Sequence, residues 1–434
     1  MASFSFGAGN AAKLARLPLY AAGRLATLLV PRTHDLWVFG CAVGIADGAL
    51  SLWEVAAAHG ERTVWLVANA SEATDASARG IRTVRKHSLR GFWLTARARV
   101  VVVTHGFGDV NRYATHGAYV VQLWHGIPLK RIGLDSRETL RPPAALGHGR
   151  AARLARRVLG FLYRRTAHGI RLIPAASHTV RGRLESAFGL PDERVPVTGE
   201  PRVDVLSRGS APERRTVARR RIEELTGPVG PQSRLVLYAP TWRDGERDPA
   251  VPSAAEWRGL VEMLARRDAV LLVRSHPLGA GEYAPPVATD RVRSLGSDIV
   301  ADVTPLLSGL DALVTDYSSL VFDASLVPLP VVLLAPDVEA YARRRGFYGT
   351  YADIAGTDAG TDAVDDWPAA TERLDALLGD PGIEQAAIER SRALDARVHA
   401  FRDGHNTTRV YRAILAGLGR PIDTPAAGRE EGRG

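Results

Sequence analysis

The sequence predicts an α/β fold made of two domains, each built on a parallel sheet. Short runs rich in Val and Leu alternate with longer amphipathic segments, a pattern typical of parallel α/β units rather than of a β-sandwich or a helical bundle. The chain has 434 residues, more than one ordinary core accommodates. A polar, arginine-rich stretch containing the breaker sequence Gly227-Pro-Val-Gly-Pro231 divides the apolar runs into two groups.

These observations give the expected strands and domain limits. The predicted strands are residues 36–39, 63–67, 100–103, 119–123, 195–198, 235–238, 270–273, 312–314 and 331–334. The predicted organisation is a basic amphipathic segment (1–33), an N-terminal α/β domain (34–206), a linker (207–233) with a helical piece at 217–225, a C-terminal α/β domain (234–417) and a disordered tail (418–434). The tail is rich in Gly, Pro, Ala and charge and has no apolar period, so we expect no packed structure in it.

Composition narrows the class of protein. Hydrophobic residues make up 46% and charged residues 24% of the chain, which excludes general disorder. The single cysteine, Cys41, excludes an internal disulfide framework and fits the cytoplasm. The longest apolar stretch, residues 320–336, is interrupted by one Asp and two Pro, so it cannot supply the roughly 20 apolar residues of a membrane span. The start of the chain lacks the basic residues of a secretory signal.

The net charge of +9 implies an acidic partner, for which nucleic acid, anionic lipid and phosphorylated substrates all qualify. Residues 13–30 and 150–165 carry basic residues and leucines at helical spacing. Each segment is either a membrane-surface helix or a helix that packs its apolar side inward, and the sequence leaves both readings open. The second, with six arginines, is the stronger membrane candidate. We expect no nucleic acid, because interleaved basic and aromatic residues are missing.

Four polar motifs directly follow predicted strands. In open parallel sheets, ligands bind outside the carboxyl ends of the strands, so these residues are the first candidates for a site. The motifs are Trp124-His-Gly-Ile-Pro-Leu-Lys130, Ala239-Pro-Thr-Trp-Arg-Asp244, Arg274-Ser-His-Pro277 and Thr315-Asp-Tyr-Ser-Ser319. Because the first belongs to the N-terminal domain and the others to the C-terminal one, we expect them to face each other across a cleft.

The C-terminal motifs offer groups suited to phosphate. Ser318 and Ser319 are expected to cap a helix whose backbone amides would receive a phosphate, although ordinary helix capping accounts for the same serines. Arg274 and His276 place a cation and an imidazole where they would hold a diphosphate, although a structural loop histidine is the alternative. The third loop adds a hydroxyl and a guanidinium group, from Thr241 and Arg243.

The N-terminal motif offers a candidate general base. His125 lies between Trp124 and Gly126, so it should project from a tight turn toward the second domain. An imidazole that titrates near neutrality can accept the proton of an acceptor hydroxyl, whereas a structural histidine bonded to the backbone is the alternative. Lys130 adds positive charge nearby.

Together these motifs resemble the CDP-glycerol glycerophosphotransferase family of teichoic-acid and capsule synthesis. The resembling residues are 122–130, 199–204, 237–244, 274–277, 302–304, 311–323 and 345–348, with Asp337, Tyr341, Asp403, Gly404 and Arg409. They follow the family's order from about residue 34 to about residue 415.

The resemblance implies a GT-B architecture, in which two Rossmann-like domains face a central cleft. The N-terminal domain is then the acceptor and membrane side, and the C-terminal domain binds the CDP-activated donor. His125 matches the residue regarded as the base, and His276 matches an essential residue near the donor phosphates. The further predicted substrate-binding residues are Trp124, Gly126, Pro128, Lys130, Arg202, Pro240, Thr241, Arg243, Arg274, Asp316, Ser318, Ser319 and Asp323. The family usually has Thr where Ile127 stands and Asn where Val203 stands. The resemblance therefore does not decide which polyol is transferred.

The predicted function is transfer of glycerol phosphate, or a related polyol phosphate, from CDP-glycerol to a hydroxyl of a membrane-linked acceptor, with release of CMP. The alternatives are a GT-B glycosyltransferase using a nucleotide sugar and a non-enzymatic basic module that binds membranes. No Asp-X-Asp pair follows a predicted strand at a plausible site, and the cationic groups can neutralise the phosphate charges. We therefore expect no essential metal and no other cofactor. The expected location is cytoplasmic, peripheral on the inner face of the cell membrane.

Overall fold

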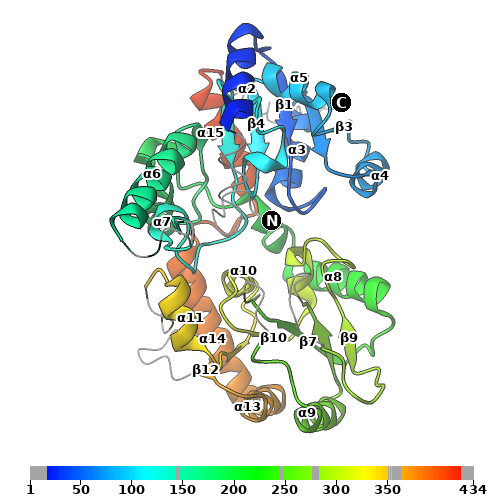
Figure 1. The fold of residues 1–434 in the computed structure, drawn as a ribbon. Coiled ribbons are helices and arrows are strands. Elements are labelled where there is room, and N and C mark those ends of the chain that lie inside the picture. The colour runs from blue at the N-terminus through cyan, green and yellow to red at the C-terminus, as the bar shows by residue number, and fades with distance from the viewer. Residues whose placement is uncertain are drawn as a thin grey trace, which may run out of the picture.

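Two domains, each with a six-stranded parallel sheet, make up the computed structural model of the chain (Figure 1). The structure describes residues 17–142, 147, 149–241, 243, 248–275, 283–349, 351, 353 and 363–421. The predicted α/β class with two parallel sheets is therefore confirmed.

The first sheet has the strand order β3-β2-β1-β4-β5-β6. Its strands are β1 (Leu36–Phe39), β2 (Arg62–Val67), β3 (Thr83–Arg85), β4 (Val100–Val103), β5 (Tyr119–Gln122) and β6 (Ile170–Leu172). β1 pairs in parallel with β2 on one side and β4 on the other. Since the chain changes direction across the sheet between β1 and β4, their carboxyl ends form the topological switch point where ligands bind in such sheets.

The second sheet repeats this topology. Its strands are β7 (Arg234–Ala239), β8 (Ala269–Val273), β9 (Val292–Ser294), β10 (Ala312–Thr315), β11 (Val331–Leu334) and β12 (Ala363–Val364), in the order β12-β11-β10-β7-β8-β9. Its switch point lies between β7 and β10, which pair in parallel. Each domain thus offers one ligand-binding edge.

Helices cover the two sheets, whose central strands are buried. The helices of the first domain are α2 (Leu17–Leu29), α3 (Asp47–Ala58), α4 (Ala70–Ala78), α5 (Leu89–Arg97), α6 (Arg150–Ala167) and α7 (His178–Phe188). Those that follow are α8 (Ala211–Thr226), α9 (Ala254–Arg266), α10 (Leu320–Ser325), α11 (Val338–Arg345), α13 (Trp367–Gly379), α14 (Pro381–Val398) and α15 (Asn406–Gly417). The 3₁₀ turns are η1 (Phe107–Asp109), η2 (Gly133–Asp135), η4 (Asp192–Arg194), η5 (Pro201–Leu206) and η6 (Thr304–Gly309).

Eight of the nine predicted strands are confirmed within a residue or two at each end, and the strand at 195–198 is wrong. That segment forms only an isolated bridge between Val197 and Ala175. Pro196 has no N–H to donate to a ladder, which accounts for the interrupted pairing. The four strands that the sequence did not predict, β3, β6, β9 and β12, are the outermost strands of the two sheets. Edge strands are short and partly polar, so their apolar signal is weak.

The last helix, α15, belongs to the first domain although it follows the second in sequence. Val410, Tyr411 and Ile414 are buried in the core beneath the first sheet, and the Tyr411 hydroxyl donates to Glu61. Figure 1 shows α14 on the second domain and α15 on the first. The predicted domain limit at 417 must therefore move to the turn before α15.

The predicted linker is also part of a domain. α8 packs along η6 of the second domain, and Arg215 and Arg219 pair with the buried carboxylate of Asp311. Of the predicted N-terminal segment, residues 1–16 lie outside the described part of the chain. Of the predicted disordered tail, residues 422–434 also lie outside it, whereas Arg420 pairs with Glu61.

A buried carboxylate holds the start of α15 in place. Asp204 accepts from the amides of Asn406 and Thr407, at 2.9 and 2.8 Å, and from the Thr407 hydroxyl at 2.6 Å. We expect Asp204→Ala to lower the free energy of unfolding by at least about 2 kcal/mol, because each buried donor left unpaired costs about 1–3 kcal/mol. Urea unfolding measures this. The control Asp75→Ala, on the exposed side of α4, should change stability by less than about 0.5 kcal/mol, and equal effects would contradict the clamp.

Candidate functional site

The two sequence motifs singled out on opposite domains meet in the structure. A Cβ atom added to Gly126 would lie 3.2 Å from Oγ of Ser319 and 3.3 Å from Nη1 of Arg202. Gly126 also has a φ of +121°, a conformation that side-chain-bearing residues avoid. A glycine here therefore lets the turn after β5 approach the start of α10, and it brings His125 to the junction of the two domains.

His125 is held between aromatic rings at this junction. Its ring stacks on His105, with centroids 4.2 Å apart and planes 2° apart, and it lies 4.3 Å from the ring of Trp124. Nδ1 is 3.4 Å from the carbonyl oxygen of Thr104. A carbonyl only accepts, so this contact requires the hydrogen on Nδ1 and leaves the lone pair of Nε2 available to take a proton.

Burial lowers the pKa of His125 to about 4, against a weaker opposing effect of the Thr104 carbonyl, because a desolvated site disfavours the charged imidazolium. Burial also lowers the pKa of His105 well below its ordinary value, and the neighbouring His125 adds to the effect. Both rings are therefore neutral at pH 7. A neutral imidazole is the form that a general base needs.

Arg202 joins the two domains through an ion-pair fork. Its Nε lies 3.2 Å from Oδ1 of Asp47, at the start of α3, and its Nη1 lies 2.6 Å from Oδ2 of Asp323 in α10. The remaining nitrogen, Nη2, donates to Oγ1 of Thr304 at 3.0 Å. Only a planar guanidinium can satisfy three partners in these directions at once. The predicted site residues Arg202 and Asp323 thus lie together, at the contact between the domains.

Carboxylates outnumber cations around this fork. Glu200, Asp302, Asp47 and Asp323 all act on Arg202. Burial raises the pKa of Asp47 to about 6 and that of Glu200 to about 8, although Arg202 opposes both shifts. Oε2 of Glu200 and Oδ1 of Asp323 are buried with no hydrogen-bond partner among the described residues. Three aspartates, Asp47 from the first domain and Asp302 and Asp323 from the second, therefore surround one guanidinium.

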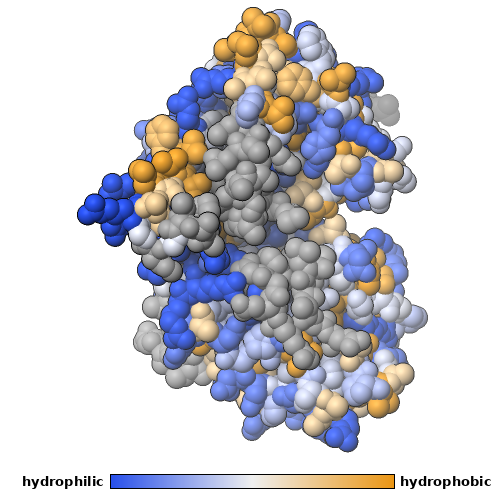
Figure 2. Space-filling model, viewed as in Figure 1, coloured by the Kyte–Doolittle hydropathy of each residue, from blue (hydrophilic) through white to orange (hydrophobic). Residues whose placement is uncertain are grey.

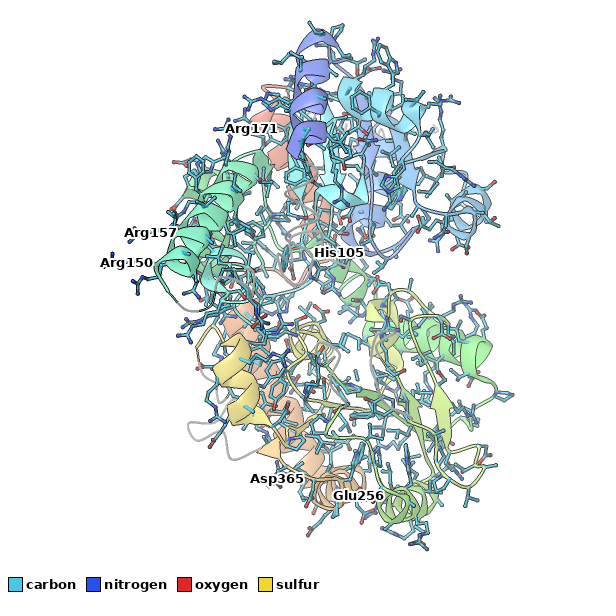
Figure 3. The ribbon with its side chains drawn as sticks, in the orientation of Figure 1. His105, Arg150, Arg157, Arg171, Glu256 and Asp365 are labelled. Atoms are coloured by element: carbon cyan, nitrogen blue, oxygen red, sulfur yellow. The ribbon has the colours of Figure 1, made fainter. Side chains whose placement is uncertain are left out.

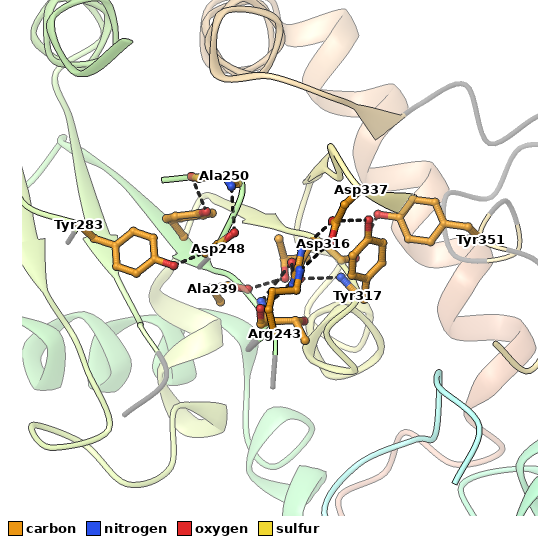
Figure 4. Close-up of polar contacts among 12 residues, drawn as sticks. Ala239, Arg243, Asp248, Ala250, Tyr283, Asp316, Tyr317, Asp337 and Tyr351 are labelled. Atoms are coloured by element: carbon orange, nitrogen blue, oxygen red, sulfur yellow. Dashed lines mark hydrogen bonds and ion pairs between the residues drawn. The ribbon is translucent and has the colours of Figure 1, made fainter. Parts of the chain in front are cut away.

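The second strand-end loop is held by Arg243 and Asp316 (Figure 4). The Arg243 guanidinium lies 2.8 Å from Oδ2 of Asp316 and donates twice to Asp337, at 3.0 Å each. It also lies 4.9 Å above the ring of Tyr317. Asp316 in turn accepts from the Thr241 amide at 2.9 Å. In the structure these two predicted ligand residues bind each other and tie three loops together, so a role at a phosphate stays a prediction.

The serine motif begins a short helix as predicted, but with a different bond. α10 spans only Leu320–Ser325, with Ser319 at its N-cap position, and the Ser319 hydroxyl makes no capping hydrogen bond. Instead Oγ of Ser318 accepts from the amide of Leu320 at 3.3 Å. The Ser319 hydroxyl faces Gly126 of the other domain. Its contribution to the site is the contact across the junction.

The remaining predicted residues take different positions. Arg274 donates to the carbonyls of Leu295, Val300 and Ala301 at 2.9–3.2 Å, so its guanidinium orders that loop. His276 lies outside the described residues, and its proposed role stays a prediction. In the first domain, the Pro128 carbonyl accepts from Arg183, and Lys130 lies 5.9 Å from the ring of Tyr341 in the second domain. In the second domain, Pro240 is half-buried. The buried hydroxyl of Thr241 has no hydrogen-bond partner among the described residues.

Sequence reasoning missed His105, Thr104 and Glu200. His105 follows the strand 100–103 within two residues, so the strand-end rule that found His125 could have found it as well. Glu200 precedes η5 and carries no comparable signal. Its importance arises only because the fold buries it beside Arg202.

Two Rossmann-like domains of this topology, meeting at their ligand-binding edges, define the GT-B class of transferases. A family model described as CDP-Glycerol:Poly(glycerophosphate) glycerophosphotransferase matches residues 38–416. The chain belongs to this family, and the sequence-based resemblance is confirmed.

Known relatives and structures agree with this assignment. The chain is 28% identical over 279 residues to a teichoic acid glycerol-phosphate transferase of Staphylococcus aureus, covering 62% of this chain and 65% of that protein. It is 25% identical over 296 residues to a teichoic acid poly(glycerol phosphate) polymerase of Bacillus subtilis, covering 67% of this chain and 37% of that protein. The chain thus spans less than two thirds of either relative. Among solved structures it resembles the wall teichoic acid polymerase TagF, with a TM-score of 0.71, 20% identity and 93% of each chain covered, which supports the GT-B fold.

The raised pKa of Glu200 makes a prediction about stability. Folding raises the pKa of Glu200 from 4.5 to about 8. The protonated carboxyl therefore contributes stability at low pH, and this contribution is lost as the pH rises from about 4.5 to about 8. Glu200→Gln should therefore be more stable than the natural protein at pH 8 by at least about 1.4 kcal/mol, the equivalent of one pKa unit. The difference should shrink toward pH 5.

Urea unfolding at pH 5, 6.5 and 8 tests this, with the exposed Glu193→Gln as the matched control. A pH-independent difference between Glu200→Gln and the natural protein would show that Glu200 does not titrate in this range.

Proposed function

We propose that this protein transfers glycerol phosphate, or a related polyol phosphate, from CDP-glycerol to a hydroxyl of a membrane-linked acceptor, in the synthesis of teichoic acid or a similar cell-wall polymer. The observation that carries the proposal is the approach of the His125 turn to Ser319 and Arg202, which brings a neutral base from one domain to the ligand edge of the other. Family membership supports the reaction type. A TagF structure soaked with CDPG supports the donor class.

The chemistry requires a proton acceptor and a place for the departing phosphate. Nε2 of His125 removes the proton from the acceptor hydroxyl, and that oxygen forms a bond to the phosphorus that carries the polyol. The bond from this phosphorus to the bridging oxygen breaks, and CMP leaves with that oxygen. Donors on the second domain, with His276 as the predicted residue near the phosphates, then stabilise the leaving group.

Product analysis separates this reaction from sugar transfer. Purified protein is incubated with CDP-glycerol or CDP-ribitol and a lipid-linked disaccharide, and CMP and product mass are measured. The expected result is release of CMP together with an acceptor heavier by one or more polyol phosphates. Release of a nucleoside diphosphate from a nucleotide sugar, with no CMP from either CDP donor, would establish the glycosyltransferase instead.

Replacing the base should stop the chemistry without unfolding the chain. We expect His125→Ala to lower kcat by about 10²–10⁴-fold, the usual contribution of a positioned general base. Because the pKa of His125 is lowered to about 4, kcat/KM of the natural protein should stay level from pH 7 down to about 5 and fall below that. The control His168→Ala alters an exposed histidine at the end of α6. Near-normal turnover in folded His125→Ala would contradict the assignment.

The outer surface of the first domain supports a peripheral membrane location. Leu25, Leu28 and Leu29 of α2 are 61–78% exposed, so these three leucines do not pack inward. α6 buries Leu159 on its inner side and exposes Phe161. Figure 2 shows apolar surface over α2 and over α6, and Figure 3 shows arginines of α6 pointing outward beside it. Among the described residues, none of the helices is long and apolar enough to cross a bilayer.

Apolar side chains flanked by arginines are suited to an anionic membrane surface. We therefore propose that the protein docks through α2 and α6 on the inner face of the cell membrane. The double variant Leu154→Ser, Phe161→Ser should bind anionic phosphatidylglycerol vesicles at least about tenfold more weakly, because burying each such side chain is worth about 1.5–3 kcal/mol. Co-sedimentation measures this. The control Val287→Ser changes a residue that is equally exposed, at 68%, on the second domain, and equal loss in both variants would contradict the docking surface.

A further inference from the structure

Three side chains with metal-binding atoms converge next to His125. Cys41 follows β1, Asp47 begins α3, and His105 follows β4, all at the switch point of the first sheet. The sulfur of Cys41, a carboxylate oxygen of Asp47 and a ring nitrogen of His105 all lie within 4.8 Å of one another. Figure 3 shows His105 at the edge of the first domain that faces the second.

We propose that Cys41, Asp47 and His105 form a binding site for a divalent transition-metal ion, with Zn²⁺ as the best match. Thiolate, imidazole and carboxylate are together the ligands that Zn²⁺ takes, whereas Mg²⁺ and Ca²⁺ prefer oxygen alone. In a tetrahedral zinc site the bonds are about 2.0–2.3 Å long. Closing the three atoms around an ion therefore requires only small side-chain movements.

Each of the three ligands is already oriented by a second contact. The Thr104 hydroxyl lies 3.2 Å from Sγ of Cys41 and 2.8 Å from Nδ1 of His105, and the Val43 amide also donates to the sulfur. The Thr104 hydroxyl thus contacts two of the three ligands at once and holds the His105 ring beside the sulfur. Bonds of this kind fix ligand orientation in metal sites.

Asp47 is oriented in the same way from the other side. Its Oδ1 accepts from the Gly48 amide at 2.6 Å and from Nε of Arg202 at 3.2 Å, and neither bond uses Oδ2. An ion beside Arg202 would be repelled by the guanidinium. Asp302 and Asp323 offset that repulsion, because both carboxylates act on Arg202. The local charge therefore favours a cation.

A metal ion at this place departs from the sequence-based expectation of no essential metal. One ground for that expectation was the lack of an Asp-X-Asp pair, which is insensitive to ligands that come from three separate loops. Three protein ligands leave one tetrahedral position open. An ion on His105 would also hold the plane of the ring on which His125 stacks, so the site would position the base.

Cobalt substitution tests the site without reference to activity. Tag-free protein is stripped with a chelator, titrated with Co²⁺ and followed by absorption. We expect one equivalent to bind, with a thiolate-to-Co²⁺ charge-transfer band in the near ultraviolet and visible bands of tetrahedral intensity. Competition by Zn²⁺ should remove both. Absence of the charge-transfer band in the natural, folded protein overturns the proposal, whatever its catalytic activity.

Variants identify the ligands. Cys41→Ser should abolish the charge-transfer band, and His105→Asn should prevent stoichiometric binding. Thr104→Val keeps the shape but removes the orienting hydroxyl, so it should weaken Co²⁺ binding by about 10–100-fold. His168→Gln, which changes the exposed residue directly after α6, should leave the titration unchanged. Persistence of the band in Cys41→Ser, or an equal loss in His168→Gln, would show that the ion binds elsewhere.

Discussion

The structure depends on the contact of one guanidinium with two carboxylates from different domains. Arg202 reaches Asp47 of the first domain and Asp323 of the second, and both acids are nearly inaccessible to solvent. Moving such charges out of water is costly unless the geometry satisfies them. Arg202 meets this condition by using Nε and both terminal nitrogens, the last on Thr304. The two switch points are thereby fixed relative to each other, and the turn with His125 rests directly on this contact.

Apolar packing supports the same junction from one side. A single buried cluster contains Trp124 and Ile127 from the first domain and Tyr317 and Phe322 from the second. Domains that share an apolar core are less free to move than domains joined by a polar contact alone. α15 adds a further connection, because the chain leaves the second domain and is held at Asp204 before it packs under the first sheet. The site therefore lies beside an interface that combines an apolar cluster with polar contacts such as the bond from the Tyr348 hydroxyl to Asp135.

The sequence was sufficient to predict the features that depend on local residue patterns, namely the central strands and the polar residues at their ends. Val- and Leu-rich runs marked the central strands, and polar residues after them marked His125 and Ser319, because strand ends in parallel sheets converge by topology. It did not reveal pairings between distant residues. The fork at Arg202 joins residues 47, 202 and 323. The guanidinium of Arg243 forms ion pairs with Asp316 and Asp337. A guanidinium at a strand end is equally compatible with a phosphate and with a buried carboxylate, and only the folded chain decides between them.

Burial and the charged fork at Arg202 together determine how readily His125 accepts a proton. Desolvation keeps the His125 imidazole neutral in the resting protein, so it is ready to accept a proton, but the same desolvation would make the resulting imidazolium unstable. Arg202 and Lys130 add to this cost, because both lower the pKa of the imidazole. Asp47 and Asp323 pair with Arg202 and so offset part of its charge. The fork that joins the domains thus also sets the electrostatic environment in which the base takes up its proton.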